Sequence, residues 1–363
     1  MQNSALYEVA LSLIPGIGNV LTKQLVSYCG SAQEVFKKPR GKLMKIPNIG
    51  PKIADAIVGS KVLNQAEEEL NNAERLGAEI LFYTSSAYPK RLSKIINAPI
   101  LLYYKGEASL NADKVLSIVG TRRATNYGRE FIEKLVAEFK TLDDLIIVSG
   151  LAYGIDIQAH KVSLKHNIPT VGVMANGLDM VYPADHKETA RKMIEQGGLL
   201  TENKFGTKPD APKFPERNRI IAGIADAVLV VEATASGGAL ITAEIANSFD
   251  IDVMALPGGI HQKSSEGCNK LIKEHKAHLV TSAADVISLL NWDIPKNTLK
   301  KKLTIALDQE EQIIYDLLTS KEHQIDELSY KSRIPIGKLP AILLNMELKG
   351  LLKPYPGQKY KLI

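Results

Sequence analysis

The residues best suited to chemistry in this chain are arginines, glycines and hydroxyl side chains that directly follow short apolar runs. Residues 120–123 read GTRR, 149–150 read SG, 213–219 read KFPERNR and 236–242 read SGGALIT. Small residues let backbone N–H groups approach an anion, and arginine donates paired hydrogen bonds to it. Phe214 adds a surface on which a nucleobase can stack. These residue types together predict a site for single-stranded nucleic acid.

The predicted DNA-binding residues either follow a strand or belong to the KFPERNR segment. They are Gly120, Thr121, Arg122, Arg123, Ser149, Gly150, Lys213, Phe214, Arg217, Asn218, Arg219, Ser236, Gly237, Gly238 and Thr242. Arg217 and Arg219 lie two positions apart, so one is expected to face the site while the other braces a neighbouring strand or its carboxylate. In a structural alternative, Phe214 caps the core and Glu216 pairs with an arginine.

Nine short apolar runs predict the strands that position these residues. They cover residues 80–83, 100–104, 115–119, 145–148, 170–174, 199–201, 227–231, 252–255 and 278–280. Helical patterns lie between them at residues 128–140, 155–165, 187–196, 238–248 and 269–275. This alternation predicts an α/β domain over residues 79–295 with a doubly wound, mostly parallel sheet. Ligands of such sheets bind at the carboxyl ends of the strands. KFPERNR is expected in a long loop after the strand at 199–201.

The segment before this domain, residues 1–78, contains a loose repeat. Residues 14–18 read IPGIG and residues 46–50 read IPNIG, and each is followed by an apolar helical pattern. Glycine and asparagine suit a tight turn, and the following helix N-terminus can receive a phosphate. The pair resembles a tandem helix-hairpin-helix DNA-binding motif. A helical bundle joined by glycine turns is the alternative.

The segment after the domain begins with a linker, residues 291–302, that contains three consecutive lysines. Helical patterns at residues 310–319, 324–330 and 336–349 then precede a hairpin with a Pro-Gly turn. Three helices and a hairpin over residues 304–363 predict a winged-helix domain. This domain is expected to read DNA only if Lys338 and Lys349 face a groove of the duplex. The alternative function of the domain is contact with another protein.

The totals exclude several classes of protein. A chain of 363 residues with 45% hydrophobic residues is long enough for two or three domains. The sequence contains no run of 18 apolar residues, so it predicts no membrane helix, and its N-terminus lacks the pattern of a secretory signal. The two cysteines cannot form a disulfide framework or a four-thiolate zinc site. A cytoplasmic protein without a membrane partner is therefore expected. Most of the net charge of +5 lies in residues 296–363.

Six motifs occur in an order that identifies a family. VGTRRATNYG, SGLAYGID, NGLDMVYP, FPERNRIIAG, SGGALITAE and LPGG followed by EGCNKLI resemble the DNA-processing protein A family, also called DprA or Smf. The resemblance implies a Rossmann-like domain that binds single-stranded DNA without catalysis, metal or cofactor. It also implies a homodimer that loads the RecA recombinase onto DNA during natural transformation. Thr121 stands where most members have serine, and Ala175-Asn176 where many have glycine and cysteine.

Two other functions fit parts of the sequence. One is a nucleotide-processing enzyme of the nucleoside monophosphate N-glycosidase kind, whose relatives carry PGGxGT followed by paired glutamates. Here Pro257-Gly258-Gly259 continues as IHQKSS, which lacks those carboxylates. The other is a winged-helix transcription regulator. The sequence contains no GxxxxGK[ST] motif, so ATP hydrolysis through a phosphate-binding loop is not predicted.

Two further groups of residues have a structural interpretation. Asp156 and His160 are spaced to share one helix face, but they have no obvious third metal ligand. Cys268 lies near a predicted helix N-terminus and is expected to be a small buried residue.

Overall fold

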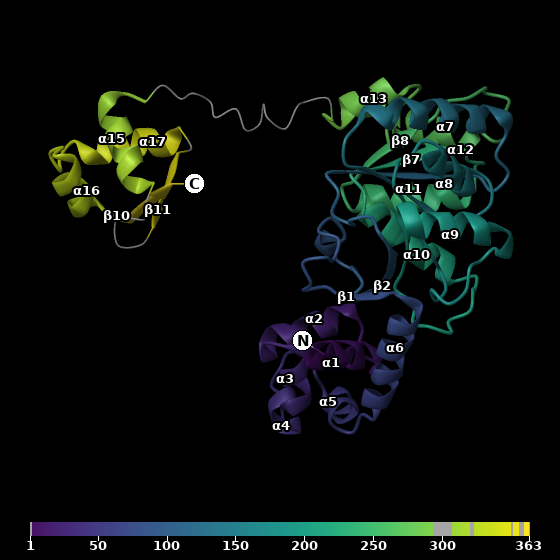
Figure 1. Ribbon diagram of the computed structural model, residues 1–363, viewed down its shortest axis with the longest axis horizontal. Coiled ribbons are helices and arrows are strands. Elements are labelled where there is room, and N and C mark those ends of the chain that lie inside the picture. The colour runs from purple at the N-terminus through teal and green to yellow at the C-terminus, as the bar shows by residue number, and fades with distance from the viewer. Residues whose placement is uncertain (1, 293–306, 320–322, 350, 356–358, 363) are drawn as a thin grey trace. The chain divides into compact units, whose positions relative to one another are not determined.

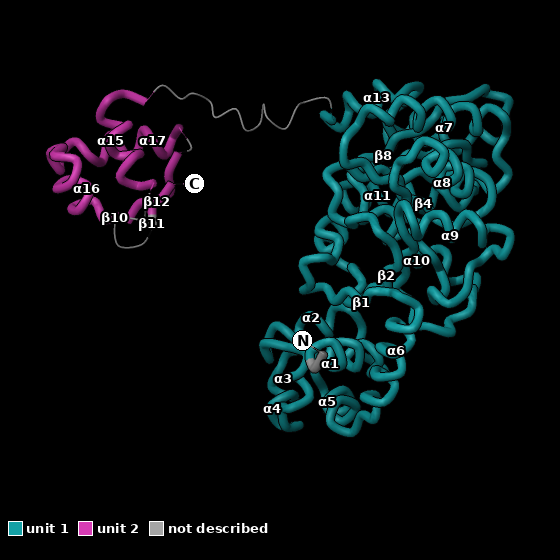
Figure 2. The backbone as a smooth tube through the Cα atoms, in the orientation of Figure 1, with its two compact units in different colours: residues 1–292 teal, residues 293–363 magenta. Residues whose placement is uncertain are grey.

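The computed structural model describes residues 2–292, 307–319, 323–349, 351–355 and 359–362. The chain divides into two compact units, residues 1–292 and residues 293–363 (Figure 2). Every predicted DNA-binding residue belongs to the first unit.

The first unit is built on a nine-stranded sheet of order β1-β2-β6-β5-β4-β3-β7-β8-β9. Figure 1 labels β1, β2, β7 and β8 of this sheet. The strands are β1 (Glu79–Phe82), β2 (Leu101–Gly106), β3 (Lys114–Gly120), β4 (Leu145–Gly150), β5 (Thr170–Val173), β6 (Gly198–Thr201), β7 (Ala227–Val231), β8 (Asp252–Ala255) and β9 (His278–Leu279). β2 pairs antiparallel with β1 and β6, and every pairing from β6 to β9 is parallel. The predicted doubly wound, mostly parallel sheet is confirmed.

Helices cover both faces of this sheet. Side chains of α10 (Lys213–Gly223), α11 (Gly238–Ser248) and α12 (Glu266–Lys273) belong to one core cluster, and those of α7 (Asn126–Glu138), α8 (Ile155–Lys165) and α13 (Ala283–Leu289) to another. Along β7, Val228 and Val230 join the first cluster while Leu229 and Val231 join the second. Because both faces are buried, β7 is apolar throughout instead of alternating with polar residues.

The described residues before β1 form helices. These are α1 (Gln2–Leu13), α2 (Asn19–Cys29), α3 (Ala32–Lys37), α4 (Arg40–Leu43), α5 (Pro51–Val58) and α6 (Val62–Leu76). In the two repeated turns, Gly16 has φ of 82° and Asn48 has φ of 62°. This left-handed conformation favours glycine and asparagine, which explains the residue types predicted for the turns. Contact of these hairpins with DNA stays a prediction.

The N-terminal helices share a core with one end of the sheet. Val9 and Leu25 belong to the same apolar cluster as Tyr103 of β2 and Leu199 of β6. Helix α9 (Lys187–Gln196) contributes Met193 to this cluster. The helical segment is therefore part of the first unit's packing and not an appended module.

The prediction that KFPERNR lies in a loop is wrong, because these residues form the start of α10. Pro215 lies in the first turn of the helix, where its missing N–H would have no intrahelical partner in any case. The presence of proline therefore misled the sequence interpretation. Helix α13 was not predicted either.

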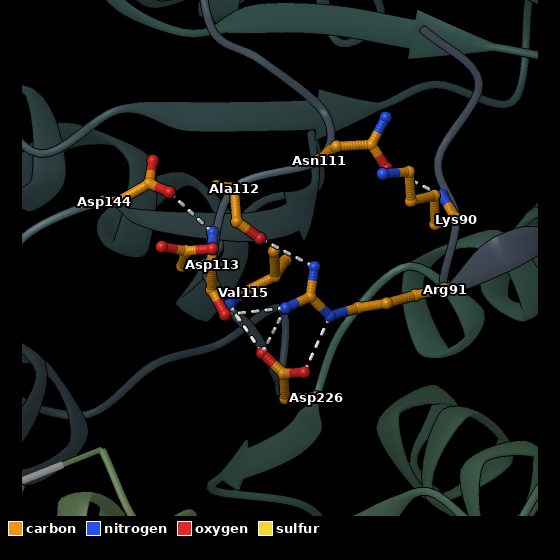
Figure 3. A network of polar contacts seen from close by, with 8 residues as sticks. All are labelled: Lys90, Arg91, Asn111, Ala112, Asp113, Val115, Asp144 and Asp226. Atoms are coloured by element: carbon orange, nitrogen blue, oxygen red, sulfur yellow. Dashed lines mark hydrogen bonds and ion pairs between the residues drawn. The ribbon is translucent and has the colours of Figure 1, made fainter. Parts of the chain in front are cut away.

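Asp226 and Arg91 fasten the amino end of β7 to the neighbouring loops (Figure 3). The Arg91 guanidinium donates to both carboxylate oxygens of Asp226 at 2.7 and 3.0 Å, and to the carbonyl oxygen of Ala112 at 2.8 Å. Asp226 also accepts from the backbone N–H of Val115 at 2.9 Å, at the start of β3. This network lies at the end of the sheet opposite to the predicted site.

The second unit has the order of a winged helix. Its elements are α15 (Gln309–Leu318), β10 (His323–Gln324), α16 (Ile325–Ser332), α17 (Leu339–Leu348), β11 (Leu352–Tyr355) and β12 (Lys359–Leu362). The strands form a sheet of order β10-β12-β11, and Ile314, Leu328 and Leu343 lie in a separate core. The winged-helix prediction is confirmed. The predicted Pro-Gly turn at residues 356–357 and most of the predicted linker lie outside the described residues.

The two lysines on which DNA reading by this unit depends are both in ion pairs. Lys349 contacts the Glu311 carboxylate at 2.6 Å, and Glu311 is buried. Lys338 lies 3.7 Å from Glu310. Lys349 therefore links the end of α17 to α15.

Among the described helices, none combines the length and the apolar composition that a membrane span requires.

Candidate nucleic-acid-binding site

A cleft of about 960 Å³ opens at the carboxyl ends of β3 and β7. The chain continues from β3 to β4 on one side, whereas β7 pairs on the other side, so this is the point at which the strand order reverses. Ligands of doubly wound sheets bind at such a point. The lining residues include Gly120, Thr121, Arg122, Phe214, Arg217, Asn218, Gly237, Gly238 and Thr242.

Arg122 and Phe214 approach each other across the cleft. The Arg122 guanidinium carbon lies 5.8 Å from the centre of the Phe214 ring, and the Tyr182 ring lies 6.0 Å from the same centre. Arg122 is exposed and forms no ion pair with a carboxylate of the described residues. Its charge is therefore available to an anion, and the two rings offer an aromatic surface beside it.

Arg217 is buried at the base of the cleft. Its Nη1 donates to the carbonyl oxygen of Val173, and its Nε donates to Asn218 Oδ1 at 3.3 Å. Burial lowers the pKa of Arg217 to about 10, although the nearby Asp156 opposes this shift. The same burial raises the pKa of Asp156 to about 6, although Arg217 opposes it. Part of the hydrogen-bonding capacity of the Arg217 guanidinium is therefore already used within the protein when no ligand is bound.

Glycine is required at position 150 because this pair leaves no room for a side chain. A Cβ atom on Gly150 would lie 2.5 Å from Asp156 Oδ2 and 2.6 Å from Arg217 Nη2. Ser149 is fully buried and its hydroxyl donates to the carbonyl oxygen of Ile118 at 2.5 Å. The predicted role of Ser149 in contacting DNA is therefore corrected to an internal hydrogen bond between β4 and β3.

Arg219 is a brace. Its guanidinium contacts the Glu202 carboxylate at 2.5 Å, just beyond β6, and both side chains are largely buried. Burial raises the pKa of Glu202, and the Arg219 charge opposes the shift. Arg217 lines the cleft and Arg219 pairs with a carboxylate, which is the placement expected from their spacing, while contact of Arg217 with DNA stays a prediction. A direct contact of Arg219 with DNA is not favoured by this geometry.

Besides Ser149, Gly150 and Arg219, three more predicted residues lie outside the cleft lining. Arg123 is exposed, next to Arg122 on the same loop. Lys213 donates to Asn203 Oδ1 at 3.3 Å and lines a different groove with residues 202–204. Ser236 lines a shallow groove along α11. DNA contact by these three stays a prediction.

Asp156 and His160 do not form a metal site. His160 is fully buried, and its ring nitrogens lie 2.7 Å from Thr170 Oγ1 and 2.8 Å from the carbonyl oxygen of Gly150. Burial lowers the pKa of His160 to about 4, so the ring is neutral at pH 7. Within the described part of the chain, no group of three potential ligands is placed to hold a metal ion. Cys268 is buried, as expected.

Three residues at or behind the cleft were not among the predicted DNA-binding residues. Tyr182 and Asp156 line the cleft, and Glu232 lies directly after β7. The position after a strand was the signal that identified the GTRR loop, and it applies equally to Glu232. Tyr182 lies in the loop that follows β5, and its expected role was only to shape that loop beside the site.

Two family models match this chain. A family model described as DNA recombination-mediator protein A matches residues 79–291, and one described as DprA winged helix domain matches residues 300–358. Protein Smf of Synechocystis sp. is 29% identical over 391 residues, which cover 98% of each chain.

Two solved structures are similar. The X-ray structure of DNA processing protein A from Streptococcus pneumoniae has a TM-score of 0.68 and 32% identity, and covers 79% of this chain and 98% of that chain. A structure of DNA processing protein A from Helicobacter pylori, described for its unique single-stranded DNA binding mode, has a TM-score of 0.54 and 26% identity. It covers 60% of this chain and 96% of that chain.

Proposed function

This chain belongs to the DNA recombination-mediator protein A family, also called DprA or Smf, and on that premise we propose that its cleft binds single-stranded DNA. The observation that carries the proposal is the exposed Arg122 lying over the Phe214 ring at the point where the strand order reverses. A free cationic group beside an aromatic surface is the combination that a single strand requires. The described binding mode of the Helicobacter pylori relative supports the same ligand.

The backbone around this pair favours phosphate contacts over base reading. Helix α11 begins after Gly237, which has no side-chain cap, so its first N–H groups are available to an acceptor. Contacts to phosphate fix a strand in place without selecting a sequence. We therefore expect little sequence preference.

The proposal is tested by titrating a labelled oligonucleotide into the full chain and three variants. Arg122→Ala removes a charge-assisted contact and should weaken binding about ten- to a hundredfold. It should also flatten the dependence of log K on log salt by about 0.7. Phe214→Ala should weaken binding by roughly 1–3 kcal/mol without changing that slope.

Arg123→Ala is the comparison variant, because it removes the same charge from the same loop outside the cleft lining. A much smaller loss of affinity than in Arg122→Ala would assign binding to the cleft and contradict the predicted DNA contact of Arg123. Equal losses in the two arginine variants would keep Arg123 in the site and assign binding to the charge of the loop. A parent protein that does not prefer a single strand to a duplex would favour the transcription-regulator alternative.

The finer parts of the family's biology are also proposals for this chain. We propose that the protein acts by binding alone, forms a homodimer through residues 79–295, and loads the RecA recombinase during natural transformation. Release of free base from nucleoside monophosphates would instead support the enzyme alternative. Light scattering that finds only monomer at micromolar concentration would contradict the homodimer, and no stimulation of RecA filament formation would contradict the loading role.

A further inference from the structure

Glu232 is a buried carboxylate immediately behind the cleft. It follows β7, is 2% exposed, and has φ of 59°, which a residue with a side chain rarely adopts. No lysine or arginine of the described residues forms an ion pair with it. A buried charge without a countercharge is costly unless hydrogen bonds and dipoles compensate it, so the partners of Glu232 require an explanation.

Those partners belong to the GTRR loop, residues 121–125. The backbone N–H of Thr121 donates to the backbone oxygen of Glu232 at 2.8 Å, which fixes the start of the loop. The backbone N–H of Thr125 donates to Glu232 Oε2 at 2.8 Å, and the Thr125 hydroxyl donates to Oε1, which fix its end. One residue thus holds both ends of the loop that presents Arg122.

The carboxylate also occupies the N-terminus of α7. Thr125 is the residue before this helix, and its side chain caps no N–H of the helix. A Cβ atom on Gly128, in the first turn, would lie 2.5 Å from Glu232 Oε2, so the carboxylate lies directly against that turn. The partial positive charge of a helix N-terminus stabilises an anion there.

In dinucleotide-binding sheets, the helix N-terminus after the first parallel strand receives the pyrophosphate. In this chain, α7 follows β3, the first parallel strand, and Glu232 supplies an anion of the protein itself at that place. We propose that Glu232 is a positioning residue: its carboxylate takes the phosphate position at α7 and so holds the loop that directs Arg122 into the cleft. The inference rests on the proposed binding of single-stranded DNA for its functional part.

The test uses the full chain with Glu232→Gly, because glycine adopts the positive φ without strain and the substitution removes the carboxylate together with the rest of the side chain. Its affinity for a single-stranded oligonucleotide should fall about tenfold. Combined with Arg122→Ala it should produce little further loss, because the two substitutions remove the same contact. Glu232→Gln can keep both hydrogen bonds if the Thr125 hydroxyl rotates, so it should stay within about threefold of the parent.

Asp226→Ala is the matched control at the other end of the same strand. It removes a carboxylate that accepts three hydrogen bonds at the opposite end of β7, so it should lower stability and leave DNA affinity unchanged. An Asp226→Ala variant that loses affinity as Glu232→Gly does would reduce Glu232 to a general stabilising role and overturn the inference.

A second readout does not involve DNA. Formate should raise the melting temperature of Glu232→Gly by about 2–4 °C over an equal concentration of chloride, since it can replace the missing carboxylate. Formate should have no such effect on the parent. Absence of this rescue, or full DNA affinity in Glu232→Gly, would refute the inference. A parent that fails to bind single-stranded DNA would refute the proposed function, while the formate experiment would still test the position of the carboxylate.

Discussion

Asp156 and His160 lie one helical turn apart on α8, and burial shifts their pKa values in opposite directions. Asp156 titrates near 6 in the folded protein instead of 3.8, so the fold favours its protonated form. The resulting stabilisation is present below about pH 4 and is lost as the pH rises to 6. His160 titrates near 4 instead of 6.5, so its stabilisation is present above 6.5 and is lost as the pH falls. The two contributions therefore offset each other between pH 4 and 6.

Replacing Asp156 by asparagine should separate these contributions. At pH 8 the variant should be less stable than the parent, because the substitution leaves the buried Arg217 guanidinium without the carboxylate charge that opposes the lowering of its pKa. Relative to the parent, its free energy of unfolding should fall more steeply on acidification from pH 6.5 to 4, since the contribution of His160 is then unopposed. Urea denaturation across this range is the measurement. A variant with the parent's pH profile would show that Asp156 is ionised in the folded state throughout.

The two turns of the N-terminal repeat depend on backbone conformation at single positions. Gly16 has φ of 82°, whereas Gly18, two residues later, has an ordinary φ of −91°. Neither would bring a new Cβ within 4 Å of a neighbouring atom. Gly16→Ala should therefore destabilise the protein by about 1–2 kcal/mol through conformational strain alone, and Gly18→Ala should be nearly neutral. Thermal denaturation of both variants checks this, and equal effects would refute the conformational explanation.

The elements that could be predicted from sequence are those in which local pattern and tertiary role agree. Each of the nine apolar runs overlaps a strand, and most residues of these strands are buried in one sheet, although both residues of the edge strand β9 are exposed. Helix α10 was missed because proline suggests a break when its place in the first turn is unknown. The opposed roles of Arg217 and Arg219 followed from spacing. The role of Glu232 did not, because its partners lie more than a hundred residues earlier in the chain.

At the scale of the whole molecule, the cleft belongs to the first unit alone. All of its lining residues precede residue 293, and the second unit has its own core. A chain that ends at residue 292 should therefore fold and bind single-stranded DNA within about threefold of the full chain. Calorimetry of the full chain should show two transitions, of which the shorter chain retains one. A loss of more than tenfold in affinity would place a DNA contact in residues 293–363.

Removal of residues 1–78 should lower the stability of the first unit. The N-terminal helices bury apolar side chains together with β2 and β6, so a chain that begins at residue 79 would expose that surface. The family model begins at residue 79, whereas the compact unit of the structure includes the N-terminal helices, so we expect residues 1–292 to unfold together.

The order of the strands also dictates when the cleft can first exist during synthesis. β3 pairs with β4 soon after both have emerged from the ribosome, but its other neighbour, β7, arrives only after β5 and β6 have been made. Until then the β3 edge is open, and Glu232 is not present to close the loop. Until β7 has emerged the nascent protein therefore lacks the cleft, and β3 is the strand that a chaperone would need to shield from other chains.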